Sequence, residues 1–199
     1  LPIPMRFAAF DRHGRKLAAD DALVLTEHET RVPLPAVSEP PILSLNRGFA
    51  APVIARPPPP RAALKLLAAH EDDPFARYEA VQQLMLSALI EAVTSAPSAD
   101  GAADVVEAVS GLLDGWEADP AFVAETMLLP SEPLIGDQLD KVDPEAIHAA
   151  REGLRAAIYA ALADRLHAIW RHAATDGHDL SAAAKGRRRL RAVALGLLT

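Results

Sequence analysis

Seven histidines and twenty-seven acidic residues supply the side chain types that most often bind zinc or transfer protons. A zinc-binding helix typically carries two histidines four residues apart on one face. Neither His28-Glu29 nor His70-Glu71 is followed by a second histidine at that spacing. His167 and His172 are five residues apart, which turns them away from a common helix face. We therefore interpret the histidines as ordinary helix-face or surface residues and predict no metal ligand among them.

Motifs for a nucleophile or for phosphate binding are also missing from the sequence. There is no Gly-x-Ser-x-Gly turn, and Ser44 stands in an apolar extended run. No glycine-rich loop leads into a helix as phosphate binding requires. The adjacent Asp72 and Asp73 are better explained as charges at a helix start than as an acid/base pair. The chain also has no cysteine that could act as a nucleophile or a thiolate ligand. Taken together, the missing motifs predict no catalytic, cofactor-binding or metal-binding residue in this chain.

One basic run, Lys185 to Arg191, could attract phosphate. The run is short and lacks interleaved aromatic residues, so it offers only attraction that is independent of nucleotide sequence. Residues 61–184 hold eight basic and twenty-one acidic side chains, and this charge repels nucleic acid. We interpret the run as a solvated helix face, or as a face covered by a following segment, and predict no nucleic-acid partner.

The composition indicates a helix-rich protein of one or two domains. Its 199 residues are half hydrophobic and only 5% aromatic, which suits closely packed helices. No apolar run approaches the ~18 residues that span a bilayer, and the N-terminus lacks the pattern of a signal peptide. We therefore predict no membrane partner and a cytoplasmic location. Both ends of the chain are interpreted as cuts in a longer polypeptide.

Residues 1–56 carry the pattern of short β-strands. Eleven of the seventeen prolines lie in residues 1–60, where they disfavour helices. Alternation predicts a strand over Ile3 to Ala9, and Asp11 to Gly14 then supplies a turn. Further extended segments are predicted at Leu23 and Leu25, at Val32 and Leu34, and from Phe49 to Ile54. The consecutive prolines 57–60 predict a stiff linker and a domain boundary.

From residue 61 onward the apolar residues recur at helical spacing. Three Asp-Pro pairs, at Asp73, Asp119 and Asp143, predict helix starts, since the carboxylate accepts first-turn N–H groups and proline suits the first helical position. Other helices are predicted over 104–113 and 134–139, with breaks at 95–98 and 176–177 and a last helix capped at residues 179–181. The longest helix should bury one stripe: Ile147, Leu154, Ile158, Leu162, Leu166, Ile169 and Ala173.

Several segments, in this order, resemble the bacterial-type aminopeptidase N family, zinc metallo-aminopeptidases of the gluzincin type. The most specific are the run Arg47-Gly48-Phe49 followed by Ala51-Pro52-Val53, and the run Leu129-Pro130-Ser131-Glu132. The other matching segments are 1–4 with 11–14, 25–30, 70–80, 119–131, 143–147 and 186–190.

The resemblance implies an α+β fragment of two domains. Residues 1–56 would be most of a small immunoglobulin-like β-sandwich, residues 57–60 a proline-rich linker, and residues 61–199 the first part of an all-α helical array. In this family a thermolysin-like catalytic domain, with a His-Glu-x-x-His zinc site and a Gly-Ala-Met-Glu-Asn motif, precedes these parts. Neither motif occurs here, so no catalytic or metal residue carries over. Zinc is expected only in the missing catalytic domain.

The resemblance further implies a structural role for this chain. The expected function is that of a non-catalytic segment of a zinc-dependent aminopeptidase that removes N-terminal residues from peptides. The segment would support the catalytic domain and limit substrate access, and it should be inactive alone. Its partners would be the catalytic domain and further C-terminal helices of the same chain, with peptides as substrates of the whole enzyme. The alternative is a free-standing helical scaffold with a β appendage that binds a protein partner.

Overall fold

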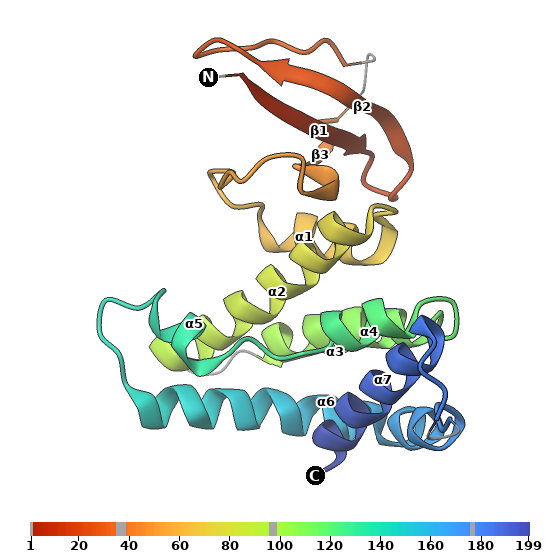
Figure 1. Cartoon of the computed structure of the whole chain (residues 1–199). Coiled ribbons are helices and arrows are strands. Elements are labelled where there is room, and N and C mark those ends of the chain that lie inside the picture. Colours follow the sequence, from red (N-terminus) through yellow and green to blue (C-terminus); the bar gives the residue numbers. More distant parts are fainter. Residues whose placement is uncertain (1, 35–38, 96–98, 176–177) are drawn as a thin grey trace. The chain divides into compact units, whose positions relative to one another are not determined.

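The computed structural model describes residues 2–34, 39–95, 99–175 and 178–199. The chain forms two compact units, Leu1–Val81 and Gln82–Thr199, and the division falls inside one helix. The first unit contains the strands, the first helix and the start of the second helix; the second unit contains the rest of that helix and the later helices (Figure 1). The proline-rich segment at 57–60 marks the change from strands to helices, and its role as a domain boundary stays a prediction.

The first unit is built on a three-stranded antiparallel sheet in the order β2-β1-β3. The strands are β1 (Ile3–Phe10), β2 (Lys16–Leu25) and β3 (Ile42–Leu45). Phe7 to Phe10 of the central strand are all buried, so the second half of β1 is covered on both faces. The predicted turn after β1 is confirmed, because Asp11 Oδ1 accepts hydrogen bonds from the N–H groups of His13 and Arg15, at 2.9 Å each.

Two of the predicted extended segments are wrong, and a third is misplaced. Val32 and Leu34 are not in a strand, since the neighbouring proline at 33 has no N–H to donate to a ladder. Residues 47–49 form a 3-10 turn, η1 (Arg47–Phe49), where an extended segment from Phe49 was predicted. Leu23 and Leu25 close β2 and do not begin it. The small β region followed by a helical array agrees with the predicted fold class.

Seven α-helices lie in the described residues after the strands (Figure 1). α1 (Arg61–His70) belongs to the first unit, and α2 (Pro74–Thr94) begins there. The second unit holds α3 (Ala99–Leu113), α4 (Pro120–Thr126), α5 (Glu132–Gly136), α6 (Pro144–His172) and α7 (Ala182–Leu198). In this unit α6 packs against α3, α5 and α7, and α7 also packs against α4. None of the described helices is long and apolar enough to cross a membrane.

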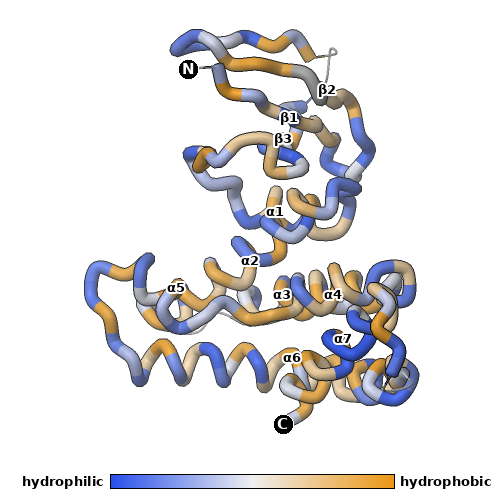
Figure 2. The backbone as a smooth tube through the Cα atoms, in the orientation of Figure 1, coloured by the Kyte–Doolittle hydropathy of each residue, from blue (hydrophilic) through white to orange (hydrophobic). Residues whose placement is uncertain are grey.

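The predicted helix starts at Asp119 and Asp143 are confirmed. Asp119 accepts a hydrogen bond from the Phe122 N–H at 2.9 Å, and Asp143 accepts one from the Ala146 N–H at 3.1 Å. Ser181 caps α7 in the same way. All seven residues predicted for the stripe of the longest helix are buried. Hydrophobic and hydrophilic residues alternate along this helix (Figure 2), as a helix with one buried face requires.

Two helix boundaries differ from the predicted ones. α3 begins at Ala99, five residues before the predicted start at Asp104, and Asp100 lies in its first turn. α5 begins at Glu132, because the Ser131 hydroxyl accepts a hydrogen bond from the Leu134 N–H and Pro133 fits the first turn. The predicted breaks at residues 96–98 and 176–177 lie outside the described residues.

Candidate functional site: a polar clamp at the α1–α2 corner

Three acidic residues join α1 to α2. The Glu71 N–H donates to the Leu67 carbonyl at 2.9 Å and so closes the last turn of α1. Asp73 Oδ1 accepts from the Ala76 N–H at 3.0 Å and caps the start of α2. Glu71 Oε1 accepts from the Asp73 N–H at 2.8 Å, which ties the end of one helix to the start of the next. The corner is therefore shaped locally by its own carboxylates.

Arg47, which lies in the turn after β3, reaches this corner from 24 residues away. Its Nε and Nη2 donate to Glu71 Oε1 at 3.2 and 3.1 Å, and the two side chains are only 8% and 0% exposed. Arg47 Nη2 also donates to the Asp72 carboxylate. A buried charge that loses its partner is costly, so this ion pair constrains both residues strongly.

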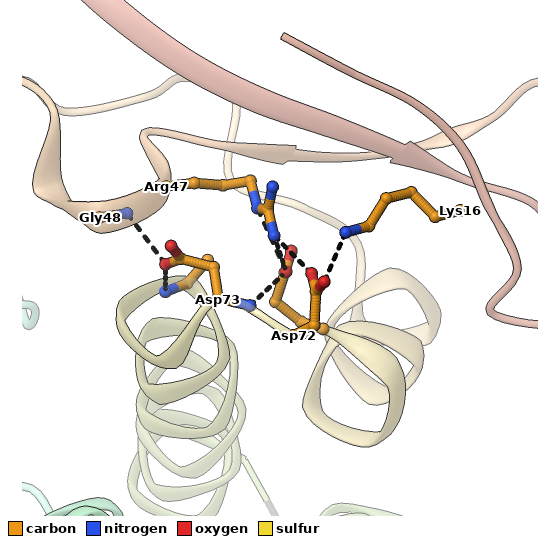
Figure 3. A network of polar contacts seen from close by, with 7 residues as sticks. Lys16, Arg47, Gly48, Asp72 and Asp73 are labelled. Carbon is orange, nitrogen blue, oxygen red and sulfur yellow. Dashed lines mark hydrogen bonds and ion pairs between the residues drawn. The ribbon is translucent and has the colours of Figure 1, made fainter. Parts of the chain in front are cut away.

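Two further contacts complete the network, which we call the polar clamp: Lys16, Arg47, Gly48, Glu71, Asp72 and Asp73 (Figure 3). Lys16 Nζ at the start of β2 donates to Asp72 Oδ2 at 2.5 Å. The Gly48 N–H donates to Asp73 Oδ1 at 2.9 Å, on the oxygen that also caps α2. The hydrogen bond from Lys16, and to a smaller extent the charge of Arg47, lowers the pKa of Asp72 below its usual value and keeps its carboxylate ionised.

The turn that carries Arg47 has an unusual backbone. Asn46, Gly48 and Phe49 all have positive φ, at 56°, 64° and 52°. The Asn46 side chain closes the turn, since its amide donates to the Ala51 carbonyl and accepts from the Ala51 N–H, at 2.9 Å each. The Phe49 ring lies 5.2 Å from that of Phe75 in the first turn of α2, measured between centroids. The turn is thus fixed to the corner by an aromatic contact as well as by charge.

The turn between β1 and β2 meets the same corner. Gly14 has φ of 79°, and a Cβ atom on it would lie 2.2 Å from the His70 ring. Only glycine fits this position without displacing the histidine. Three segments of the strand region, at residues 14, 16 and 47–49, therefore converge on residues 70–75.

The geometry of the polar clamp favours a structural role. Glu71, Asp72 and Asp73 each accept hydrogen bonds from cations or amides of the chain itself. Within the described residues, no group of three or more His, Asp or Glu side chains is arranged to hold a metal ion. Carboxylates paired in this way position backbone segments, whereas an acid or base needs a free reach to a substrate.

The Leu129–Glu132 segment, which we call the LPSE loop, and the residues just before it are held by donors from two helices. Gln82 Nε2 on α2 donates to the carbonyls of Thr126 and Leu128, at 3.1 and 3.0 Å. Arg151 Nε on α6 donates to the Pro130 carbonyl at 2.8 Å. The Glu132 carboxylate lies 3.1 Å from His148 Nδ1 on α6. Both sequence segments that carried the family resemblance are thus points where separate elements are joined.

The basic run on α7 is used within the second unit. Arg187 lies over the Trp116 ring at 5.8 Å from its centroid, and Arg191 over the Trp170 ring at 4.6 Å. Arg188 Nη1 donates to the Asp179 carbonyl at 2.7 Å, and Arg189 pairs with Glu125. Four of the five basic side chains of the run therefore contact partners within the chain. The interpretation of the run as a solvated helix face does not describe these four side chains.

The other residues weighed from the sequence differ in their burial. His28, His167 and His172 are exposed. Ser44 is buried on β3, facing away from solvent. The absence of catalytic, cofactor-binding and metal-binding residues stays a prediction.

Sequence reasoning missed the pairing of Arg47 with Glu71 and of Lys16 with Asp72. The signal that could have found the first is that Arg47 and Glu71 both stand inside segments of the family resemblance.

Two family models match the chain. Residues 1–57 match a domain of unknown function, DUF3458, described as an Ig-like fold, and residues 61–199 match a domain of unknown function, DUF3458_C, described as ARM repeats. Among solved structures, an aminopeptidase A of Legionella pneumophila in complex with aspartic acid aligns with a TM-score of 0.83 and 24% identity. The alignment covers 99% of this chain and 24% of the Legionella pneumophila chain, and the aligned parts share the same fold.

Curated relatives agree with these matches. The protein named Aminopeptidase N of Caulobacter vibrioides is 35% identical over 179 residues, covering 89% of this chain and 21% of its own length. The Aminopeptidase N of Escherichia coli is 27% identical over 180 residues, covering 85% and 21%. The chain thus spans about a fifth of the relatives' length. Because the ARM-repeat model alone matches well over half of it, the chain belongs to the DUF3458_C family and carries a DUF3458 Ig-like domain ahead of the repeats.

Proposed function

We propose that this chain is the non-catalytic, structural part of a zinc-dependent aminopeptidase that removes N-terminal residues from peptides. The aminopeptidase activity is suggested by the relatives named Aminopeptidase N. The structural role rests on one observation: the polar clamp uses its charged groups to join the strand region to the α1–α2 corner. The Arg47–Glu71 pair of the clamp is buried, and a buried ion pair fixes the geometry of the segments that it joins.

The described residues do not fit a zinc ion. They contain no group of three or more His, Asp or Glu side chains with suitable geometry, and the sequence has no cysteine. Zinc would therefore be held by another part of the same polypeptide. There it would activate water for attack on the peptide bond.

The partners we propose are other parts of the same polypeptide: a catalytic domain and further C-terminal helices. The ARM-repeat match supports the second partner, because stacked repeats bury their apolar faces against neighbouring repeats. We propose a cytoplasmic enzyme with peptide substrates and no nucleic-acid or membrane partner.

We also propose that the acidic helical array limits substrate access. Glu145 in the first turn of α6 is exposed, whereas Glu152 pairs with Arg155 on the same helix. Charge reversal of Glu145 therefore tests the acidic surface without breaking an ion pair that the structure shows. In the complete enzyme, Glu145→Lys should change KM for peptides and leave the melting temperature unchanged. An unchanged KM for peptides would show that substrate does not pass this surface.

The activity itself is tested with the protein of the complete reading frame beside residues 1–199. The longer protein should bind zinc and release N-terminal residues from peptides, while residues 1–199 should bind no stoichiometric zinc and release none. Zinc-dependent turnover by residues 1–199 alone would overturn the proposal. A reading frame without His-Glu-x-x-His would favour the scaffold alternative.

The structural role is tested by Arg47→Met in the complete enzyme, with Arg12→Met as the matched control. Arg12 makes an exposed ion pair with Glu39, so its loss should matter little. Arg47→Met should lower the melting temperature and leave KM for a small chromogenic substrate unchanged. An unchanged melting temperature with a raised KM would instead place Arg47 in contact with substrate.

A further inference from the structure

The second unit contains an apolar pocket that neither the polar clamp nor the LPSE loop uses. It has a volume of about 410 Å³ and lies between α2, α3 and α6. All nine lining residues belong to the second unit, and seven of them are Ala or Gly while the other two are Leu. Apolar pockets of roughly 300–1,000 Å³ between helices are common binding sites for ligands. This pocket therefore has the size and the lining of a ligand site.

Gly153 leaves part of this pocket open. It lies inside α6, where glycine weakens a helix relative to alanine. A Cβ atom at Gly153 would have no described neighbour within 4 Å outside the backbone of its own helix. Close packing among the described residues therefore does not require a glycine here, and a larger side chain at this position would have room.

Two of the three helices around the pocket carry negative charge only. The parts of α2 and α3 that belong to the second unit hold four carboxylates and no Lys or Arg. One of them, Glu91, is adjacent to Ala92 of the pocket lining and one helical turn from Ala88. The charge continues along the chain, since residues 78–140 hold twelve acidic residues and no Lys or Arg. A hollow with low-dielectric walls and charge of one sign attracts ions of the opposite sign.

α6 adds a carboxylate on either side of its lining residues. Glu145 lies one turn before Ala149, and Glu152 lies one turn after it. Glu152 pairs with Arg155, and Arg151 is engaged by the LPSE loop. Glu145 is exposed and makes no ion pair with another described residue. It is therefore the carboxylate of this stretch that can pair with a cation from outside the chain.

We propose that this pocket binds a peptide that carries a large apolar side chain next to Lys or Arg. The apolar side chain occupies the space beside Gly153, and the neighbouring cation pairs with Glu145. Complementarity selects this occupant, because the lining is apolar and the surrounding helices are acidic. The proposal goes beyond the proposed function, since it assigns a binding site to a segment with a structural role and needs no peptidase activity.

NMR of the alanine methyl groups measures binding directly, because six alanines line the pocket. Titration of residues 1–199 with the peptide acetyl-Lys-Leu-Lys-amide should shift the methyl signals of Ala92, Ala146 and Ala149. Ala161, exposed further along α6, should not respond. Replacing Leu by Ala in the peptide should weaken binding about tenfold, since the burial of a large apolar side chain is lost. Absent shifts, or equal shifts with acetyl-Glu-Leu-Glu-amide, would overturn the proposal.

Substitutions in the chain separate binding from folding. Gly153→Leu fills the pocket and replaces glycine by a better helix former, so it should weaken binding at least about tenfold without lowering the melting temperature. Gly111→Leu on α3 is the matched control, because its Cβ also has open space and Gly111 lies outside the pocket lining. Glu145→Gln should weaken binding about threefold, as expected for one exposed ion pair. Unchanged binding by Gly153→Leu would overturn the proposal.

Two comparisons test the choice of occupant. n-Hexylamine has a cation and an apolar chain but no peptide backbone, so binding as tight as that of the peptide would assign the pocket to small amines and overturn the choice. The protein of the complete reading frame should show the same methyl shifts, and their absence there would mean that another part of the polypeptide fills the pocket. Peptide binding by a longer protein without peptidase activity would contradict the proposed function and leave the binding site standing.

Discussion

The α1–α2 corner and the LPSE loop both join distant elements, but they use different chemistry. At the corner, oppositely charged side chains meet out of contact with solvent, as Arg47 and Glu71 do. At the loop, side chains of Gln82 and Arg151 donate to backbone carbonyls. Every residue carries a backbone carbonyl, so the contacts at the loop require particular residue types only at the donors. The ion pair at the corner requires a particular residue type at both partners.

The largest expected effect is at the corner. Glu71→Ala removes the buried partner of Arg47 and leaves it only the exposed Asp72 carboxylate, so the free energy of unfolding should fall by about 3 kcal/mol, the lower end of the range for a broken buried pair. Urea denaturation of residues 1–199 measures this. Glu29→Ala is the control, since Glu29 pairs with Arg31 in solvent and should change stability by less than about 1 kcal/mol. A cost for Glu71→Ala no larger than that of the control would show that the two regions do not differ as described.

A smaller effect is expected at the loop. Gln82→Ala removes the donor to two carbonyls and should cost about 1–3 kcal/mol, because water can reach the more exposed Leu128 carbonyl. The same denaturation measurement applies, with Gln138→Ala as an exposed control. If Gln82→Ala lowered the free energy of unfolding more than Glu71→Ala, the side-chain donor to backbone carbonyls would contribute more stability than the buried ion pair.

Removal of one helix cap should cost less again. Ser131→Ala removes the oxygen that accepts from the Leu134 N–H and should destabilise the loop by about 1 kcal/mol. Hydrogen exchange at the Leu134 amide should accelerate, while Ser87→Ala in the exposed middle of α2 should leave it unchanged. An unaltered exchange rate would mean that α5 does not need this cap.

The smallest effect concerns the exposed part of the polar clamp. Asp72→Asn should cost less than about 1 kcal/mol at pH 7, because the Asp72 side chain is 60% exposed. The folded state lowers the pKa of Asp72 below 3.8, so its ionised form stabilises the fold above that pH. The difference from the parent chain should therefore shrink as the pH falls below 3.8. A difference that grows on acidification would contradict this sign.

Local rules predicted much of the helical part. Asp119 and Asp143 accept the hydrogen bonds expected of helix caps, because a cap is decided within three or four residues. The strand region was harder. The turn at 46–51 is closed by the Asn46 amide and contains three residues with positive φ. The alternation of apolar residues along the sequence predicts neither of these two features.

The sequence by itself determined the change from strands to helices, the capped helix starts and the buried stripe of α6, since each depends on neighbours within a few turns of the chain. Only the tertiary structure decided that Arg47 meets Glu71, and that the arginines of α7 lie over Trp116 and Trp170. The physical reason is that an ion pair or a stacking contact has no periodicity along the chain. Its partners are chosen only when the folded backbone brings them together.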